Sequence, residues 1–134
     1  MAARIHCDGG SRGNPGPAAA GSVLLDGAGK VIDSAQEYLG IATNNLAEYQ
    51  SVLLGIELMR KHQLQDADFY LDSQLVVRQL SGQYKVKHPD MQRQFAAVQT
   101  ALQGLEVRFH HVMREHNKEA DSVVNECLDN NSTK

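Results

Sequence analysis

The chain lacks any apolar run that approaches the length of a membrane span, which needs about 18 or more consecutive apolar residues. Its first residues also lack the apolar stretch of a secretory signal. Two cysteines, Cys7 and Cys127, are too few and too irregularly placed for a disulfide framework or a zinc site. We therefore expect a cytoplasmic protein that makes no membrane contact and has two buried, reduced thiols. One structural disulfide is the alternative.

An excess of basic residues is also lacking. Lys and Arg number 13 against 16 Asp and Glu, which gives a formal net charge of -3 at pH 7. A high-affinity duplex binder usually presents a basic surface, so this charge argues against that class. The objection weakens if the acids gather in a metal site, because bound cations reverse the local sign.

No repeat, low-complexity stretch or long linker divides the 134 residues. We predict one domain over residues 1–134, with residues 130–134 as a flexible polar tail, and we expect a monomer. A chain of this length buries about two thirds of the surface that its unfolded form exposes. The hydrophobic fraction of 42% and the charged fraction of 22% are ordinary for a globular protein.

The hydrophobic pattern predicts the element order β-β-β-α-β-α-α-β-α. Strands are expected at residues 4–7, 21–26, 30–38, 67–71 and 105–113, with a glycine-rich turn at 9–17 directly after the first strand. Helices are expected from about residue 43 to 59 and at 75–80, 91–102 and 117–128. A hairpin start followed by helical crossovers predicts an α/β fold with a mixed sheet and helices on both faces.

Four acidic residues occupy places where a predicted element begins or ends: Asp8, Glu48, Asp72 and Asp121. Two carboxylates about 5 Å apart repel by ~3 kcal/mol at an effective dielectric of about 20, so they converge only where something neutralises them. Oxygen ligands alone favour Mg²⁺ or Mn²⁺. Asp8 and Asp72 follow predicted strands, and ligands in such sheets bind beyond the carboxyl ends of strands. The sequence therefore predicts a divalent-metal site.

Each polar candidate also has a purely structural interpretation. Asn44 or Asn45 suits the N-cap of a helix, and we interpret Asn117 mainly as the cap of the last helix. Asp72 and Asp121 could simply complement a helix dipole. The basic residues Lys85, Lys87 and His88 are expected to be a solvated run. The other histidines, His6, His62, His110 and His111, show no metal-ligand spacing and are assigned to surface or strand positions.

Four blocks together resemble the signature of type 1 ribonuclease H. They are residues 8–17 (DGGSRGNPGP), 43–48 (TNNLAE), 71–74 (LDSQ) and 117–121 (NKEAD), in the family's order and at compatible separations. The resemblance covers the chain from about Arg4 to Leu128. It implies the ribonuclease H-like fold, a five-stranded mixed sheet flanked by helices. It also implies endonucleolytic hydrolysis of the RNA strand of RNA–DNA hybrids, which leaves 5′-phosphate and 3′-hydroxyl ends.

The resemblance assigns roles to individual residues. The four acids become ligands of two Mg²⁺ or Mn²⁺ ions, with Asp8 bridging both. Residues at the family's hybrid-contact positions are Ser11, Gly13, Asn14, Asn44, Asn45 and Gln74, and Thr43 matches a contact to the DNA-strand phosphate. Amide side chains suit minor-groove edges, because each offers a donor and an acceptor.

Two departures from the longer bacterial members stand out. Those members grip the hybrid with a tryptophan- and lysine-rich protrusion, whereas this chain has no tryptophan and only the ten residues 81–90 (SGQYKVKHPD) in that region. They also place a histidine in a loop before the last aspartate. Here residues 113–117 (MREHN) resemble the short, archaeal-like subgroup, in which an arginine fills that neighbourhood. Arg114 is therefore the candidate for an auxiliary catalytic role, with His116 second.

Two other functions remain open from the sequence. One is a non-cleaving hybrid-binding module, which loss of the carboxylates would indicate, although all four are present. The other is a related metal nuclease acting on double-stranded RNA or DNA junctions, since a fold alone does not decide a substrate.

Overall fold

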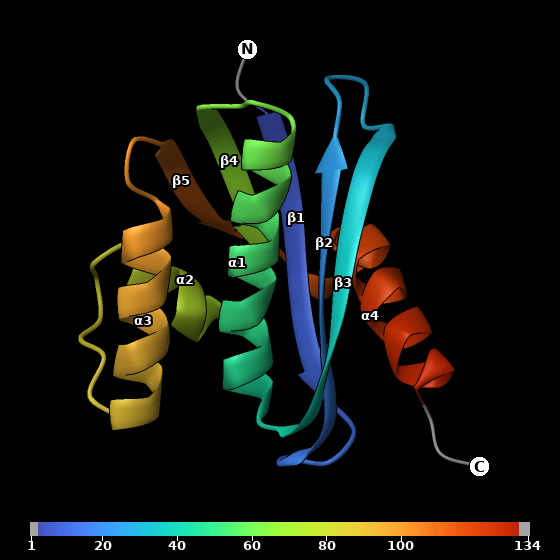
Figure 1. The fold of residues 1–134 in the computed structure, drawn as a ribbon, viewed down its shortest axis with the longest axis vertical. Helices are drawn as coiled ribbons and strands as arrows, with labels where there is room; N and C mark the ends of the chain where they lie inside the picture. The colour runs from blue at the N-terminus through green and yellow to red at the C-terminus, as the bar shows by residue number, and fades with distance from the viewer. Residues whose placement is uncertain (1–2, 132–134) are drawn as a thin grey trace.

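The computed structural model describes residues 3–131 and contains the elements in the predicted order (Figure 1). The strands are β1 (Ala3–Ser11), β2 (Gly16–Leu25), β3 (Val31–Ala42), β4 (Asp66–Leu71) and β5 (Glu106–His111). The helices are α1 (Asn44–Lys61), α2 (Gln74–Leu80), α3 (Pro89–Ala101) and α4 (Lys118–Asn130), and a single 3-10 turn at Arg114–His116 precedes α4.

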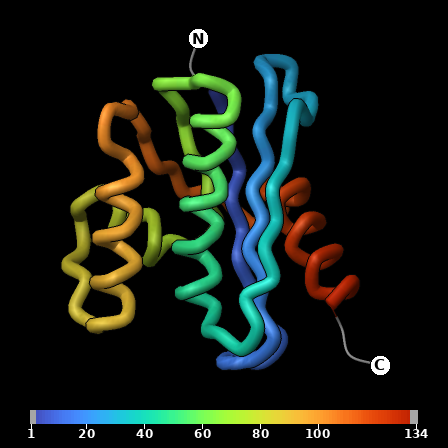
Figure 2. Tube along the Cα trace, in the orientation of Figure 1, coloured from blue at the N-terminus to red at the C-terminus, as the bar shows by residue number. Residues whose placement is uncertain are grey.

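The five strands form one mixed sheet in the order β3-β2-β1-β4-β5. The pairs β1–β2 and β2–β3 are antiparallel, as expected for a hairpin start, whereas β1–β4 and β4–β5 are parallel. Helix α1 covers one face and packs against α3, while α4 covers β1 and β2 on the opposite face (Figures 1 and 2). The predicted five-stranded α/β architecture with helices on both faces is confirmed.

The two faces of the sheet bury cores of different size. The larger core lies under α1 and includes Ile5, Tyr49, Phe69 and Val98, all fully buried. The smaller core lies between α4 and β2 and includes Ala19, Val124, Cys127 and Leu128. Cys7 and Cys127 are both free and buried, as the sequence predicts. None of the helices formed by residues 3–131 combines the length and apolar character that crossing a bilayer requires.

Strand β1 continues past Asp8, so the prediction of a turn directly after this residue is wrong. Gly9, Gly10 and Ser11 remain in the strand and pair with β2. A Cβ atom on Gly9 would lie 2.2 Å from the carbonyl carbon of Ala47 in α1. Glycine is therefore required here for the close approach of a helix, whereas the sequence pattern suggested a turn.

The capping residues also differ from the predictions. Thr43, and neither Asn44 nor Asn45, caps α1, because its Oγ1 accepts a hydrogen bond from Leu46 N at 3.2 Å. Asn117 occupies the N-cap position of α4, but its side chain makes no capping hydrogen bond. It is fully buried and points into the protein.

One prediction about the chain terminus changes, and one solvated residue has an additional role. His88 is exposed, as expected, and its Nδ1 also accepts a hydrogen bond from Asp90 N at 3.2 Å and caps α3. Asn130 was expected in a flexible tail, yet it is the last residue of α4, and Asn131 follows it as the C-cap. The rest of that tail, residues 132–134, lies outside the described residues.

We expect Gly9→Ala to destabilise the fold by several kcal/mol, because overpacking against backbone cannot relax by a rotamer change. Gly10→Ala is the matched control, since the nearest atom to a Cβ there is Val124 Cγ1 at 3.9 Å. The free energy of unfolding, measured by denaturant titration, distinguishes the two. Equal stability of the two variants would contradict the proposed close approach of α1 to β1.

Candidate metal site

The candidate site forms where β1 and β4 separate. The parallel pairing of these strands ends at Cys7 and Leu71. Asp8 is the next residue of β1, and Asp72 directly follows β4, so both acids lie where the pairing of the two strands ends. Residues two apart in a strand share a face, and therefore Asp8 lies on the same face as His6, the face covered by α4.

Glu48 reaches this point from the opposite face of the sheet. It lies in the first turns of α1, which contacts β1 at Gly9. The Gly9 backbone N–H donates to Glu48 Oε1 at 3.0 Å. The absent side chain of Gly9 therefore lets a carboxylate from the α1 layer meet one from the sheet.

The structure brings three of the four predicted acids together. Asp8, Glu48 and Asp72 each offer a carboxylate oxygen, and these oxygens lie within 4.8 Å of one another. Asp121, in the first turn of α4, lies in the same cleft but outside this tight group among the described residues. Its Oδ2 accepts a hydrogen bond from Asn125 Nδ2 at 3.2 Å.

Burial and mutual repulsion change the protonation of these acids. Burial raises the pKa of Asp8 to about 8, and the nearby carboxylates of Asp72 and Asp121 add to the shift. Burial likewise raises the pKa of Glu48 well above its usual range, with the Asp8 carboxylate as the second cause. Without a counter-charge, the site therefore holds protons at neutral pH that isolated carboxyl groups would release.

A divalent cation fits this donor set. Glu48 Oε2 is buried and has no hydrogen-bond partner within the described residues, and a buried oxygen left in this way costs about 1–3 kcal/mol. Three carboxylates supply the hard oxygen ligands that Mg²⁺ and Mn²⁺ prefer. A cation would satisfy the unpaired oxygen and remove the repulsion that raises the pKa values.

Asp8, Glu48 and Asp121 line a cleft of about 310 Å³. Backbone at Gly9 and Gly10 forms part of its wall, together with side chains from β1, α1 and α4. Arg114 lies in the 3-10 turn before α4, is exposed, and lines the same cleft. His116, the second candidate, is not among the described residues that line it.

Asn14, Asn44 and Ser11 are joined by hydrogen bonds next to this cleft. Asn44 Oδ1 accepts from Ser11 N at 2.9 Å and from Ser11 Oγ at 3.1 Å. Asn14 Oδ1 accepts from the Asn44 backbone N–H at 3.1 Å. Both amide oxygens are thus occupied, and the two amide NH₂ groups are the donors that remain for a ligand.

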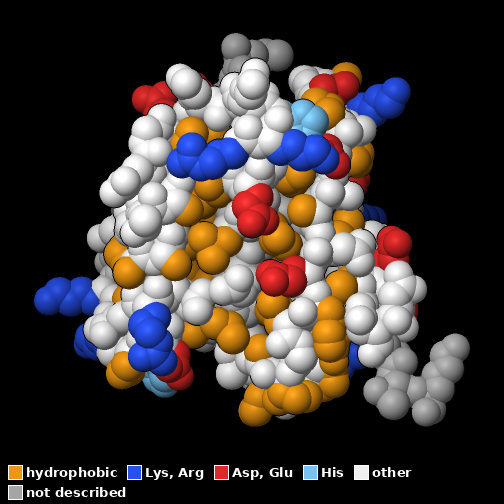
Figure 3. All heavy atoms as spheres, in the orientation of Figure 1, with side chains coloured by type: hydrophobic (Ala, Val, Ile, Leu, Met, Phe, Trp, Pro, Cys, Tyr) orange, Lys and Arg blue, Asp and Glu red, His pale blue; other side chains and the backbone are white. Residues whose placement is uncertain are grey.

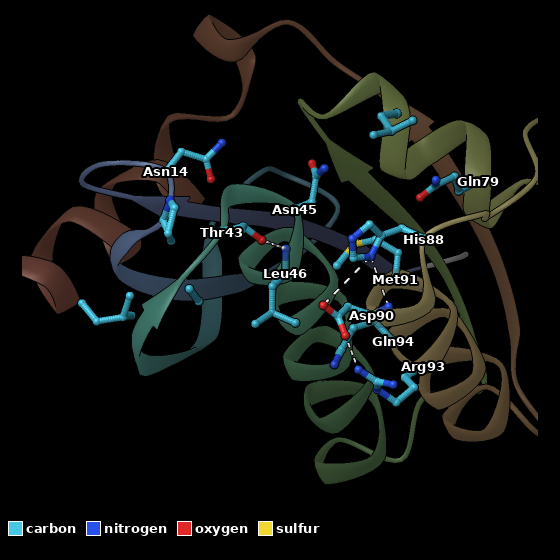
Figure 4. Close-up of a pocket in the computed structure, with 14 residues that line it drawn as sticks. Asn14, Thr43, Asn45, Leu46, Gln79, His88, Asp90, Met91, Arg93 and Gln94 are labelled. Carbon is cyan, nitrogen blue, oxygen red and sulfur yellow. Dashed lines mark hydrogen bonds and ion pairs between the residues drawn. The ribbon is translucent and has the colours of Figure 1, made fainter.

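A second cavity, of about 750 Å³, adjoins the first at Asn45. Figure 4 shows Asn14, Thr43 and Asn45 on one side of this groove and the start of α3, with His88 and Arg93, on the other. Its remaining lining residues, which the sequence did not single out, include Leu75, Gln79, Met91 and Gln94. The groove therefore begins beside the cleft that the acids line.

Two predicted contact residues lie outside these cavities. Gly13 lies in the turn between β1 and β2 with φ of +99°, and its carbonyl accepts from Ser11 Oγ. Gln74 is exposed at the start of α2, and it is not among the described residues that line either cavity. Ser11, Asn44 and Asn45 therefore share the cleft with the acids, whereas Gly13 and Gln74 do not line it.

The sequence interpretation missed the inward role of Asn117 and the burial of His6. Asn117 Nδ2 donates to Cys7 O at 2.9 Å and approaches Asp72 Oδ2 at 3.4 Å. His6 Nδ1 contacts Asn117 Oδ1 at 3.0 Å, and burial lowers the pKa of His6. The alternation of Arg4, His6 and Asp8 was a usable signal, since it places His6 on the face of a candidate ligand.

We expect the metal-free protein to gain stability from Asp8→Asn, and this gain should grow as the pH rises from about 4 to about 8. The pKa of Asp8 rises from 3.8 to about 8 on folding, so its contribution is fully present below pH 3.8 and is lost as the pH passes 8. The lowered pKa of His6 reduces the stability of the fold at acid pH, but this effect is the same in both proteins and cancels in their difference. Thermal melts in EDTA should therefore show a difference that widens with pH, and a constant difference would refute the electrostatic account.

The comparisons with known proteins agree with this geometry. The family described as reverse transcriptase-like matches residues 6–127. Ribonuclease HI of Halobacterium salinarum is 40% identical over 94% of this chain and 65% of its own length. A bifunctional protein of Mycobacterium tuberculosis is 39% identical over 93% of this chain and 35% of its own length. The chain thus spans about two thirds of the first relative and about a third of the second.

The solved structures show the same fold. LC11-RNase H1, isolated from compost and solved in complex with an RNA/DNA hybrid, matches with a TM-score of 0.93 at 36% identity. The match covers 98% of this chain and 99% of that one. The chain therefore belongs to the reverse transcriptase-like family and, within it, to the type 1 ribonucleases H.

Proposed function

We propose that this chain is a metal-dependent endoribonuclease that hydrolyses the RNA strand of RNA–DNA hybrids. The observation that carries the proposal is the convergence of Asp8, Glu48 and Asp72, whose oxygens lie within 4.8 Å of one another beside an open cleft. The products are 5′-phosphate and 3′-hydroxyl ends. The related LC11-RNase H1, solved with a hybrid, supports the substrate class.

The four acids hold two divalent ions, Mg²⁺ or Mn²⁺, in this proposal. Bound there, such ions supply a water of lowered pKa and neutralise the charge that develops on the leaving 3′-oxygen. Asp8, Glu48 and Asp72 would hold the ions, and Glu48 Oε2 would gain the partner that it lacks. Asp121 completes the set from α4.

The hybrid lies across the two adjoining cavities. Its RNA strand enters the smaller cleft beside the acids, where the glycine backbone of β1 lets a ribose approach closely. The amide NH₂ groups of Asn14 and Asn44 face base acceptors of the minor groove, because their oxygens are occupied within the protein. Thr43, at the N-terminus of α1, receives a phosphate of the DNA strand in the larger groove.

The distribution of basic side chains supports only a modest electrostatic contribution to hybrid binding. On the face that Figure 3 shows, they are separated points around the molecule, without a continuous basic patch. The exposed Lys85 and Lys87 lie in the short segment before α3. The net charge of -3 and the short segment 81–90 support binding through few phosphate contacts. A monomeric state and a cytoplasmic location stay predictions from the sequence.

We expect Asp8→Asn to reduce cleavage by at least ~10³-fold, a loss of about 4 kcal/mol in transition-state stabilisation. The variant keeps the shape of the side chain but loses one charge of the ion-binding set. The assay uses labelled RNA–DNA, RNA–RNA and DNA–DNA duplexes, each with Mg²⁺, Mn²⁺ or EDTA. Asp66→Asn, on an exposed residue at the start of β4, is the matched control and should cleave like the wild type.

The effect of Mg²⁺ on the stability of the fold is a second test of the metal site. Mg²⁺ at ten times its dissociation constant should stabilise the wild type by about 1.4 kcal/mol. Hybrid binding without cleavage in any metal would identify a binding module, and preferred cleavage of RNA–RNA would identify a different nuclease. Activity that survives EDTA would overturn the metal site itself.

We expect Arg114→Ala to lower turnover by about 10–100-fold, within the range for a group that assists proton transfer or stabilises charge. Arg114 lines the cleft beside Asp8 and Glu48, where a cation can reach the scissile phosphate. Turnover and the Michaelis constant are measured on the same hybrid. His116→Ala is the comparison and should stay near wild type. The opposite ranking of the two variants would assign the auxiliary role to His116.

A further inference from the structure

We propose that Asn117 is a positioning residue for the metal ligand Asp72, and that His6 holds Asn117 in the required orientation. The inference rests on the proposed metal site but concerns residues that do not themselves bind the ion. Asn117 lies at the N-cap position of α4, yet it is fully buried and makes no capping hydrogen bond. A buried carboxamide without a role in its own helix must satisfy its polar atoms elsewhere.

The contacts of Asn117 fix which way its amide faces. Nδ2 lies 2.9 Å from Cys7 O and 3.4 Å from Asp72 Oδ2. Both of these atoms only accept hydrogen bonds, so the NH₂ group must face them. The amide thus ties the Asp72 carboxylate to Cys7, the last residue of β1 that pairs with β4 and the residue before Asp8.

His6 completes the arrangement from the other side of the amide. Asn117 Oδ1 lies 3.0 Å from His6 Nδ1. Because this oxygen can only accept, His6 carries its proton on Nδ1 and donates it. The ring of His6 stacks on that of Tyr70 at 4.9 Å, which leaves it little freedom to turn.

Asn117 therefore determines which oxygen of the Asp72 carboxylate is available to the ion. The donor occupies Oδ2 of Asp72, so Oδ1 is the oxygen that remains for an ion. Groups that orient metal ligands in this way commonly change metal affinity or activity by about 10–100-fold when removed. Strand β1 thus carries a ligand, Asp8, and through Asn117 also holds the ligand that follows β4.

The test measures Mg²⁺ binding directly, by calorimetry and by the Mg²⁺ dependence of the melting temperature, together with turnover and the Michaelis constant on a hybrid. For Asn117→Ala we expect the half-saturating Mg²⁺ concentration to rise by about tenfold, with the Michaelis constant for the hybrid little changed. Val98→Ala, in the core under α3, is the control for lost stability alone, and its Mg²⁺ affinity should equal that of the wild type.

Variants of His6 keep the test decisive if Asn117→Ala does not fold. His6→Phe keeps an aromatic ring against Tyr70 but removes the donor, and should weaken Mg²⁺ binding in the same direction. His6→Asn restores a donor near the Nδ1 position and should recover much of the affinity. Unchanged Mg²⁺ affinity in both Asn117→Ala and His6→Phe would overturn this inference, whereas a wild type that binds no Mg²⁺ would overturn the proposed function instead.

Discussion

The close approach of α1 to β1 at Gly9 is the constraint on which the rest of the site depends. A Cβ atom at this position would lie 2.2 Å from the Ala47 backbone, so any other residue would force the two elements apart. The same contact places Glu48 Oε1 on the Gly9 N–H. Moving α1 outward by the thickness of a side chain would take Glu48 out of reach of Asp8 and Asp72. The glycine therefore sets both the packing of the main core and the spacing of the carboxylates.

This packing stores electrostatic strain. Burial raises the pKa of Asp8 to about 8, with repulsion from Asp72 as the next cause, and Glu48 keeps a buried oxygen without a partner among the described residues. A pKa that rises on folding means that ionisation at neutral pH destabilises the metal-free fold. The large core under α1, with Tyr49, Phe69 and Val98 fully buried, offsets this loss. The fold can thus hold the acids together without a cation, and a cation at the proposed site would meet a preformed group of carboxylates.

The sequence predicted the elements and the acids but not the contacts between layers. Helical and strand periodicity predicted the nine principal elements of residues 3–131 in order. The four motif blocks singled out Asp8, Glu48, Asp72 and Asp121, and the first three of these lie together. Local patterns failed where tertiary packing decides. Gly9 belongs to a pattern that is typical of a turn, yet it lies in a strand and allows the close approach of α1. Asn117 has the residue type and position of a helix cap, yet its side chain points inward to Asp72. A cap preference describes one helix terminus, whereas the direction of a buried amide depends on acceptors more than 40 residues away in sequence.

The elements that carry the four acids are not packed equally strongly. Asp8, Glu48 and Asp72 belong to β1, α1 and the end of β4, which meet in the main core. Asp121 belongs to α4, which rests on the sheet through two small clusters, one around Ala19 and Val124 and one around Val23 and Ala120. Fewer buried apolar contacts mean that a segment opens with a smaller free energy. We therefore expect the first three acids to move together as a fixed unit, and Asp121 to be the member of the proposed site whose distance adjusts when ions or products occupy the cleft.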